Sequence, residues 1–162
     1  MLKYSIGVRL SWEISSYEAS NKQASFIEID HIMLGILSLD KISSNLKNLA
    51  ETDLDNFLYE KDKLYTILLK YNIRVTSFRR KLRQLIPFGE EVPTDNVFHR
   101  SQECKKMFSS SSQFAANYIT INHLFISIIG IENSYSRNLL LAMKVDLEKI
   151  KTDLLFSFYK NN

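Results

Sequence analysis

An internal repeat is the feature that most limits how this chain can fold. The segment 27–37 reads IEIDHIMLGIL and the segment 119–129 reads ITINHLFISII, so that their histidines align 92 positions apart. A second pair lies downstream, where 72–82 aligns with 144–154 at an offset of 72 positions. Repeated units of this kind stack to bury a shared core, so the two copies are expected to build one domain.

The two offsets differ, which indicates that the first repeat contains about 20 additional residues, placed at about 40–62. This insertion is acidic, and the spacing of its apolar residues predicts one additional short helix. The segment 87–96 holds both prolines of the chain and predicts the linker between the repeats. The expected organisation is one domain over 1–162, with repeat one at 1–86 and repeat two at 97–158.

Apolar residues at helical spacing predict four helices in each repeat. The chain has only 4 glycines and 2 prolines among 162 residues, which favours helices over a turn-rich β fold. The expected fold class is therefore all-α, with two pseudo-repeats of a four-helix unit. The expected helices span 6–21, 29–39, 63–71 and 75–86 in repeat one, and 98–115, 121–131, 136–143 and 147–158 in repeat two.

Charge and cysteine content narrow the function class only slightly. The chain has 21 Lys and Arg against 18 Asp and Glu, and a net charge of +3 does not by itself imply nucleic-acid or membrane binding. Its single cysteine, Cys104, excludes an intrachain disulfide and fits a reducing compartment. The start of the chain does not read as a secretory signal, and the longest apolar-rich run, 119–131, is too short to span a bilayer. A cytoplasmic location is expected.

Both copies of the repeated motif resemble the N-terminal repeat of Clp-type AAA+ chaperones. In that family an Ile or Val precedes a Glu-His-Leu-Leu sequence, and the matches here are 27–33 and 119–125. A third match is the join Lys-Val-Asp-Leu-Glu-Lys at 144–149. The resemblance covers nearly the whole chain except the insertion. It implies an all-helical module that recruits adaptor proteins or substrate segments to an ATPase ring.

We expect no enzyme activity and no cofactor in this chain. It lacks a Gly-x-x-x-x-Gly-Lys-Ser/Thr phosphate loop, so ATP hydrolysis is expected in a downstream region or on another subunit. The serine run at 109–112 lacks the turn that surrounds a nucleophilic serine. The linker, with its Pro-Phe-Gly sequence at 87–89, resembles the branch of the family that recycles the type VI secretion sheath by gripping a helix of a sheath protein.

The first predicted helix and the residues before it supply the main candidates for a partner-binding groove, because exposed aromatic residues anchor interfaces. These candidates are Tyr4, Ile6, Leu10 and Trp12. Asp30 and Asn122 are the alternative, because the family places glutamates at these repeat-related positions. In some members those glutamates receive phosphorylated arginine. Asp30 is shorter than glutamate and Asn122 is uncharged, so phosphoarginine binding is not expected here.

Two other groups have competing interpretations. His31 and His123 could form a metal or acid–base site, but we favour core histidines that hydrogen-bond near the start of a buried helix, because neither has a second ligand at metal spacing. Arg79, Arg80 and Arg83 could form a basic patch, although a solvated helix face is favoured. The competing function is accordingly a basic helical nucleic-acid binder that uses the helix at 74–83.

Overall fold

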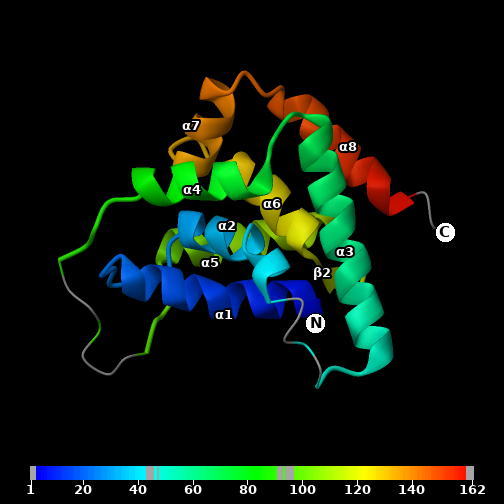
Figure 1. Cartoon of the computed structure of the whole chain (residues 1–162), viewed down its shortest axis with the longest axis horizontal. Helices are drawn as coiled ribbons and strands as arrows, with labels where there is room; N and C mark the ends of the chain where they lie inside the picture. The colour runs from blue at the N-terminus through cyan, green and yellow to red at the C-terminus, as the bar shows by residue number, and fades with distance from the viewer. Residues whose placement is uncertain (1–2, 43–45, 47, 91–92, 94–96, 160–162) are drawn as a thin grey trace.

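The computed structural model describes residues 3–42, 46, 48–90, 93 and 97–159, and its regular secondary structure is almost entirely helical (Figure 1). Residues 43–45 and 47 of the expected insertion, and 91–92 and 94–96 of the expected linker, lie outside this description. The helices are α1 (Ile6–Asn21), α2 (Ile29–Ile36), α3 (Glu51–Lys70), α4 (Val75–Leu85), α5 (Gln102–Ser111), α6 (Ile121–Ile129), α7 (Tyr135–Ala142) and α8 (Leu147–Tyr159). The prediction of an all-α fold is confirmed. Within the described part of the chain, no helix is long and apolar enough to cross a membrane.

The two central helices, α2 and α6, are buried along their whole length. All 8 residues of α2 and all 9 residues of α6 are buried. A helix that is apolar on nearly every side is stable in water only when other elements cover it. The remaining helices surround this pair (Figure 1), and their apolar residues complete one core.

Helix α1 packs closely on α2 at a glycine. A Cβ atom added to Gly35 would lie 2.1 Å from the carbonyl oxygen of Ser11 and 2.4 Å from Oγ of Ser15. Only a residue without a side chain allows the two backbones to approach so closely. The buried hydroxyls of Ser11 and Ser15 donate to carbonyl groups within α1 itself, so they remain hydrogen-bonded at this contact.

Short parallel pairings join the two repeats in a reciprocal way. Strand β1 (Lys3–Tyr4) pairs with β2 (Tyr118–Ile119), and Ile27 forms an isolated bridge with Arg100. Strand β1 precedes α1 and β2 precedes α6, whereas Ile27 precedes α2 and Arg100 precedes α5. Each pairing therefore joins the segment before the first helix of one repeat to the segment before the second helix of the other. The pattern indicates a pseudo-twofold relation between the repeats, which their similarity in sequence does not by itself predict.

The N-caps of α1 and α5 follow the same relation. The backbone N–H of Ser5 donates to Ile119 at 2.9 Å, and that of Ser101 donates to Ile27 at 3.1 Å. Each serine hydroxyl also accepts a hydrogen bond from a backbone N–H in the first turn of its own helix. These caps satisfy donors that a helix N-terminus otherwise leaves free, and they place both helix starts beside the opposite repeat.

The insertion is helical at 51–62, as predicted, but it does not form a separate short helix. Residues 51–62 are the first part of α3, which runs without a break from Glu51 to Lys70. This stretch contains neither glycine nor proline, and the buried residues Phe57, Leu64 and Leu68 continue one apolar stripe across the expected boundary at 63. The repeat-related helix α7 has only 8 residues, so the insertion lengthens the third helix of repeat one.

Apart from α3, helices α2 and α5 differ most in their ends from the prediction. Helix α2 ends at Ile36 and is followed by a 3₁₀ turn at Leu39–Lys41. Helix α5 begins at Gln102 rather than at 98, and a 3₁₀ turn at Ser112–Phe114 follows it. The later start of α5 arises because the chain before it is extended and bridges to repeat one.

The contact between α1 and α2 gives a first prediction. We expect Gly35→Ala to lower the free energy of unfolding by about 2 to 3 kcal/mol, because the new methyl group overlaps the α1 backbone. Gly130→Ala is the matched control, since its added Cβ would meet its nearest neighbour only at 3.3 Å, and a change of about 1 kcal/mol or less is expected. Urea unfolding followed by circular dichroism measures both. Equal stability of Gly35→Ala and wild type would contradict this packing.

Candidate functional site

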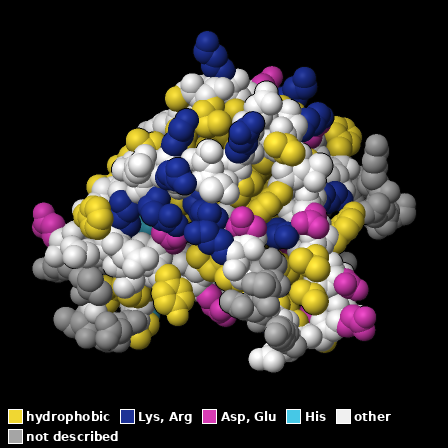
Figure 2. Space-filling view, viewed as in Figure 1, with side chains coloured by type: hydrophobic (Ala, Val, Ile, Leu, Met, Phe, Trp, Pro, Cys, Tyr) yellow, Lys and Arg dark blue, Asp and Glu magenta, His cyan; other side chains and the backbone are white. Residues whose placement is uncertain are grey.

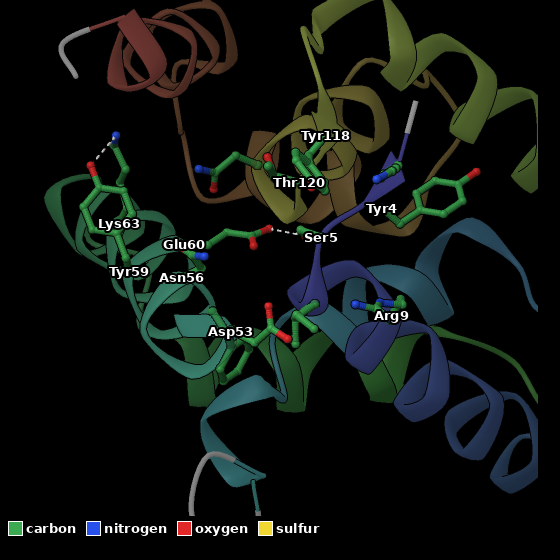
Figure 3. A pocket seen from close by; sticks show the side chains of 14 residues that line it. Tyr4, Ser5, Arg9, Asp53, Asn56, Tyr59, Glu60, Lys63, Tyr118 and Thr120 are labelled. Atoms are coloured by element: carbon green, nitrogen blue, oxygen red, sulfur yellow. Dashed lines mark hydrogen bonds between the residues drawn. The ribbon is translucent and has the colours of Figure 1, made fainter. Parts of the chain in front are cut away.

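A cavity of about 730 Å³ lies where the N-terminal ends of α1 and α6 meet the first half of α3 (Figure 3). Its apolar lining comes from Ile6, Phe57 and the rings of Tyr4, Tyr59 and Tyr118, and these three tyrosines are 41%, 55% and 50% exposed. Concave, largely apolar hollows with a few polar groups are the usual form of a binding site. The remaining lining residues are Lys3, Ser5, Arg9, Asp53, Asn56, Glu60, Lys63, Thr120 and Asn122.

Glu60 connects three helices at the polar side of this cavity. Its Oε1 accepts a hydrogen bond from the Ser5 hydroxyl at 2.9 Å and from the backbone N–H of Ile121 at 2.5 Å. Gly7, in the first turn of α1, lies against the same group, because a Cβ added there would be 3.1 Å from the carboxyl atoms. The N-terminal ends of α1 and α6 therefore both face Glu60, and such ends favour a negative charge.

Glu60 also titrates in an unusual range. Burial raises the pKa of its carboxyl group to about 7, although the hydrogen bonds from Ile121 and Ser5 favour the ionised form. The carboxyl group therefore changes its charge near neutral pH, and the polar side of the cavity becomes more negative as the pH rises through this value.

Asp30 and Asn122 occupy repeat-related positions but have different surroundings. The buried carboxylate of Asp30 accepts hydrogen bonds from the backbone N–H groups of Tyr135 at 3.0 Å and Ser136 at 2.8 Å, and from the Ser136 hydroxyl. It therefore caps the start of α7, and burial together with these hydrogen bonds leaves it little able to contact a partner protein. Asn122 lines the cavity and is 1% exposed, and its Oδ1 has no hydrogen-bond partner within the described part of the chain.

The insertion explains this difference. Helix α7 packs against α2, and α3 packs against α6 in the corresponding place. Helix α7 offers its N-terminus to Asp30, but α3 starts much earlier, at Glu51, and passes the corresponding position in mid-helix. Its side chain Glu60 instead reaches the start of α6. One of the two repeat-related positions is thus filled by a helix start, and the other opens into the cavity.

The two histidines are core residues, as predicted. Nδ1 of His31 accepts from the backbone N–H of Glu28 at 3.0 Å, and Nδ1 of His123 accepts from that of Thr120 at 3.0 Å. Burial lowers the pKa of His31 and lowers that of His123 to about 4, so both rings are neutral near pH 7. The described residues contain no group of three or more His, Cys, Asp or Glu side chains arranged to hold a metal ion.

The groove predicted along α1 is formed only at its start. Tyr4 and Ile6 line the cavity, whereas Leu10 and Trp12 lie outside its lining. The Trp12 ring packs edge-on against Phe108, with 5.5 Å between the ring centroids, and both Leu10 and Trp12 are partly buried against the core. The structure therefore assigns the second pair of candidates to packing rather than to the cavity.

The predicted basic patch on α4 is smaller than expected. Arg79 is 5% exposed, and its guanidinium group donates to a main-chain carbonyl and to Asp40 at 3.2 Å, so it belongs to the interior. The reason is its position, because residue 79 falls on the same helix face as the apolar residues Val75, Phe78 and Leu82. The guanidinium group of Arg83 donates to both carboxylate oxygens of Glu18, whereas Arg80 is exposed.

Sequence reasoning missed the wall of the cavity that α3 supplies. Phe57, Tyr59 and Glu60 were assigned to an insertion of unknown role, yet all three line the cavity. A signal was available, because Phe57 lies seven residues before Leu64 and so shares its helix face. The approach of Glu60 to the start of α6, however, depends on contacts between residues far apart in the sequence.

Comparison with known proteins identifies the fold. The Hsp104 N-terminal domain from Candida albicans is similar over 94% of this chain and 89% of that chain, with a TM-score of 0.66 and 11% identity. The N-terminal domain of the caseinolytic protease associated chaperone ClpD from Arabidopsis thaliana is similar over 97% of this chain and 95% of that chain, with a TM-score of 0.56 and 12% identity. No protein-family model and no curated protein sequence matches the chain. The chain therefore has the all-α fold of the Clp N-terminal domain.

The contrast between Asp30 and Asn122 yields a second prediction. Asp30→Ala removes the acceptor of three hydrogen bonds at the start of α7, and we expect it to lower the free energy of unfolding by about 3 kcal/mol. Asn122→Ala is the repeat-related control and should cost about 1 kcal/mol, since its Oδ1 has no partner to lose. Chemical unfolding of both variants measures the difference, and equal losses would contradict the assigned roles.

The Glu60 carboxyl group gives a third prediction, on pH dependence. Its pKa is higher in the folded chain than the ordinary value of 4.5, so the unfolded chain releases this proton first as the pH rises. Stability relative to Glu60→Gln should therefore fall between about pH 4.5 and pH 7, by roughly 1 to 2 kcal/mol once the partial exposure of the group is allowed for. The histidines are the same in both proteins, so their contribution to the difference cancels. A constant difference in unfolding free energy across this range would contradict the burial of Glu60.

Proposed function

We propose that this chain is a protein-binding N-terminal module of a Clp-type AAA+ chaperone. It would recruit adaptors or substrate segments to an ATPase ring that is not part of these 162 residues. Its fold supports this role, because the similar structures are N-terminal domains of such chaperones. The proposal assigns no catalytic step to this chain, and ATP hydrolysis would belong to the ring.

The cavity between α1, α3 and α6 is the observation that carries the proposal. Exposed aromatic rings at Tyr4, Tyr59 and Tyr118 surround an apolar floor that includes Ile6 and Phe57. Aromatic side chains supply much of the binding energy of protein interfaces when a partner covers them. The hollow is therefore suited to the apolar side chains of a protein segment, with binding free energy derived mainly from buried apolar area.

In a finer form of the proposal, the bound segment is an amphipathic helix, such as a helix of a type VI secretion sheath protein. A helix places its apolar side chains at i, i+3 and i+4, so it can insert two or three of them into one cavity. The polar groups at the cavity edge, including Lys3, Arg9 and Asp53, would then meet the polar face of the helix and set its direction.

This proposal gives a fourth prediction. A labelled, permanently unfolded polypeptide should bind the chain, and Tyr118→Ala should weaken binding about tenfold because it removes an aromatic anchor. Tyr17→Ala is the matched control, since Tyr17 is 74% exposed on α1 but does not line the cavity, and its binding should stay within about twofold of wild type. Fluorescence anisotropy measures both affinities.

A second variant tests the cavity without removing a contact. Asn56→Trp places a large ring at an exposed lining position of α3, where it should fill the hollow and leave the fold intact. We expect it to reduce binding to a similar extent. Unchanged affinity in both Tyr118→Ala and Asn56→Trp, or a wild-type chain that binds no polypeptide, would overturn the proposal.

A further inference from the structure

A second surface, at the opposite end of α1 from the cavity, is strongly basic. Between residues 74 and 85 the chain has five cationic side chains and no acidic one. Lys and Arg side chains gather over α4 in the view of Figure 2. The cavity is lined by residues within 3–9, at the start of α1, whereas this surface is lined by residues within 18–22. At the rise per residue of an α-helix, the two sites lie about 20 Å apart along α1.

A hollow of about 490 Å³ lies between the C-terminal end of α1 and helix α4. The charged side chains that line it leave an excess of positive charge. Glu18 is the acidic residue of its lining, and Arg83 already pairs with both carboxylate oxygens of Glu18. Arg80 is exposed and has no ion-pair partner within the described part of the chain, and Lys22 adds a further positive charge. The lining consists of Glu18, Asn21, Lys22, Arg80, Arg83, Gln84 and Phe88.

Phe88 gives this hollow an apolar element that is held in place. Its ring is 67% exposed, and the Lys22 ammonium group lies 4.3 Å from the ring centroid. The same ammonium group donates to the carbonyl oxygen of Ile86 at 2.8 Å, and the backbone N–H of Gly89 donates to the carbonyl oxygen of Lys22 at 2.7 Å. These bonds fix the chain on both sides of the ring, which lowers the entropy lost when a partner covers it.

We propose that this hollow binds an acidic segment of a partner protein. A partner carboxylate would pair with Arg80 and with the Nη1 group of Arg83 that Glu18 does not use. An apolar side chain beside that carboxylate would pack on Phe88. Complementary charge identifies the occupant, because the unneutralised cations of the hollow favour a negative partner and disfavour a basic one.

A nucleic acid fits this surface less well. Two of the α4 arginines, Arg79 and Arg83, already bind Asp40 and Glu18, so the row of free cations that a phosphate backbone needs is interrupted. An acidic peptide has fewer charges and can place one carboxylate beside Arg80.

Fluorescence anisotropy with a synthetic peptide tests this proposal. The probe has about 12 residues, with Glu and Asp around a single Phe. Arg80→Glu should weaken its binding at least about tenfold, and Phe88→Ala about threefold. Lys106→Glu is the matched control, because Lys106 is exposed on α5 and its substitution changes the net charge by the same amount. The affinity of this variant for the peptide should stay within about twofold of wild type. Binding should also weaken as salt screens the charges.

Four results would overturn the proposal. The first two are equal effects of Arg80→Glu and Lys106→Glu, and equal binding of a peptide that has Lys in place of Glu and Asp. The third is tighter binding of a single-stranded oligonucleotide of equal charge, which displaces the peptide. The fourth is self-association of the chain at low salt that Arg80→Glu abolishes. The last would assign the hollow to the acidic first turns of α3 in a second copy. The cavity variant Tyr118→Ala should leave peptide binding unchanged, which separates this surface from the proposed function.

Discussion

The complete burial of α2 and α6 is the constraint on which the rest of the structure depends. Neither helix has a polar face that could be left in contact with water, so the other helices of the described chain must cover them on all sides. The first residues of both helices, Ile29 and Ile121, are buried as well, and free backbone N–H groups at such positions need partners inside the protein. His31 and His123 accept from the backbone N–H groups just before α2 and α6, and Glu60 of α3 accepts from that of Ile121.

The insertion turns a nearly symmetrical arrangement into one with a single open position. Asp30 on α2 caps the start of α7, but the lengthened α3 offers no helix start to Asn122 on α6. Glu60 from α3 caps α6 instead, and the aromatic wall that comes with it completes a cavity beside Asn122. The same additional residues that set this chain apart from a simple double repeat therefore build the proposed binding site.

Periodicity and the repeat predicted most of the fold, because both are properties of the local sequence. The helix face of each element, and the shared role of His31 and His123, follow from spacing alone. Spacing places Arg79 on the apolar face of α4, but it could not show which groups bind its guanidinium there, since Leu37 and Asp40 lie on a segment distant in sequence. Neither could it place Glu60 against Ile121, because that contact joins two repeats. The cavity depends on such long-range contacts, and the sequence therefore named only Tyr4, Ile6 and Asn122 of its lining as candidates.

Hydrogen–deuterium exchange with and without a permanently unfolded polypeptide is the most direct test of the central claim, that the cavity between α1, α3 and α6 receives a protein segment. The account predicts slower exchange in residues 3–9, 51–63 and 118–122 when the polypeptide is bound, since a bound segment covers these three stretches together. Unchanged exchange in all three, with protection confined to other helices, would contradict it.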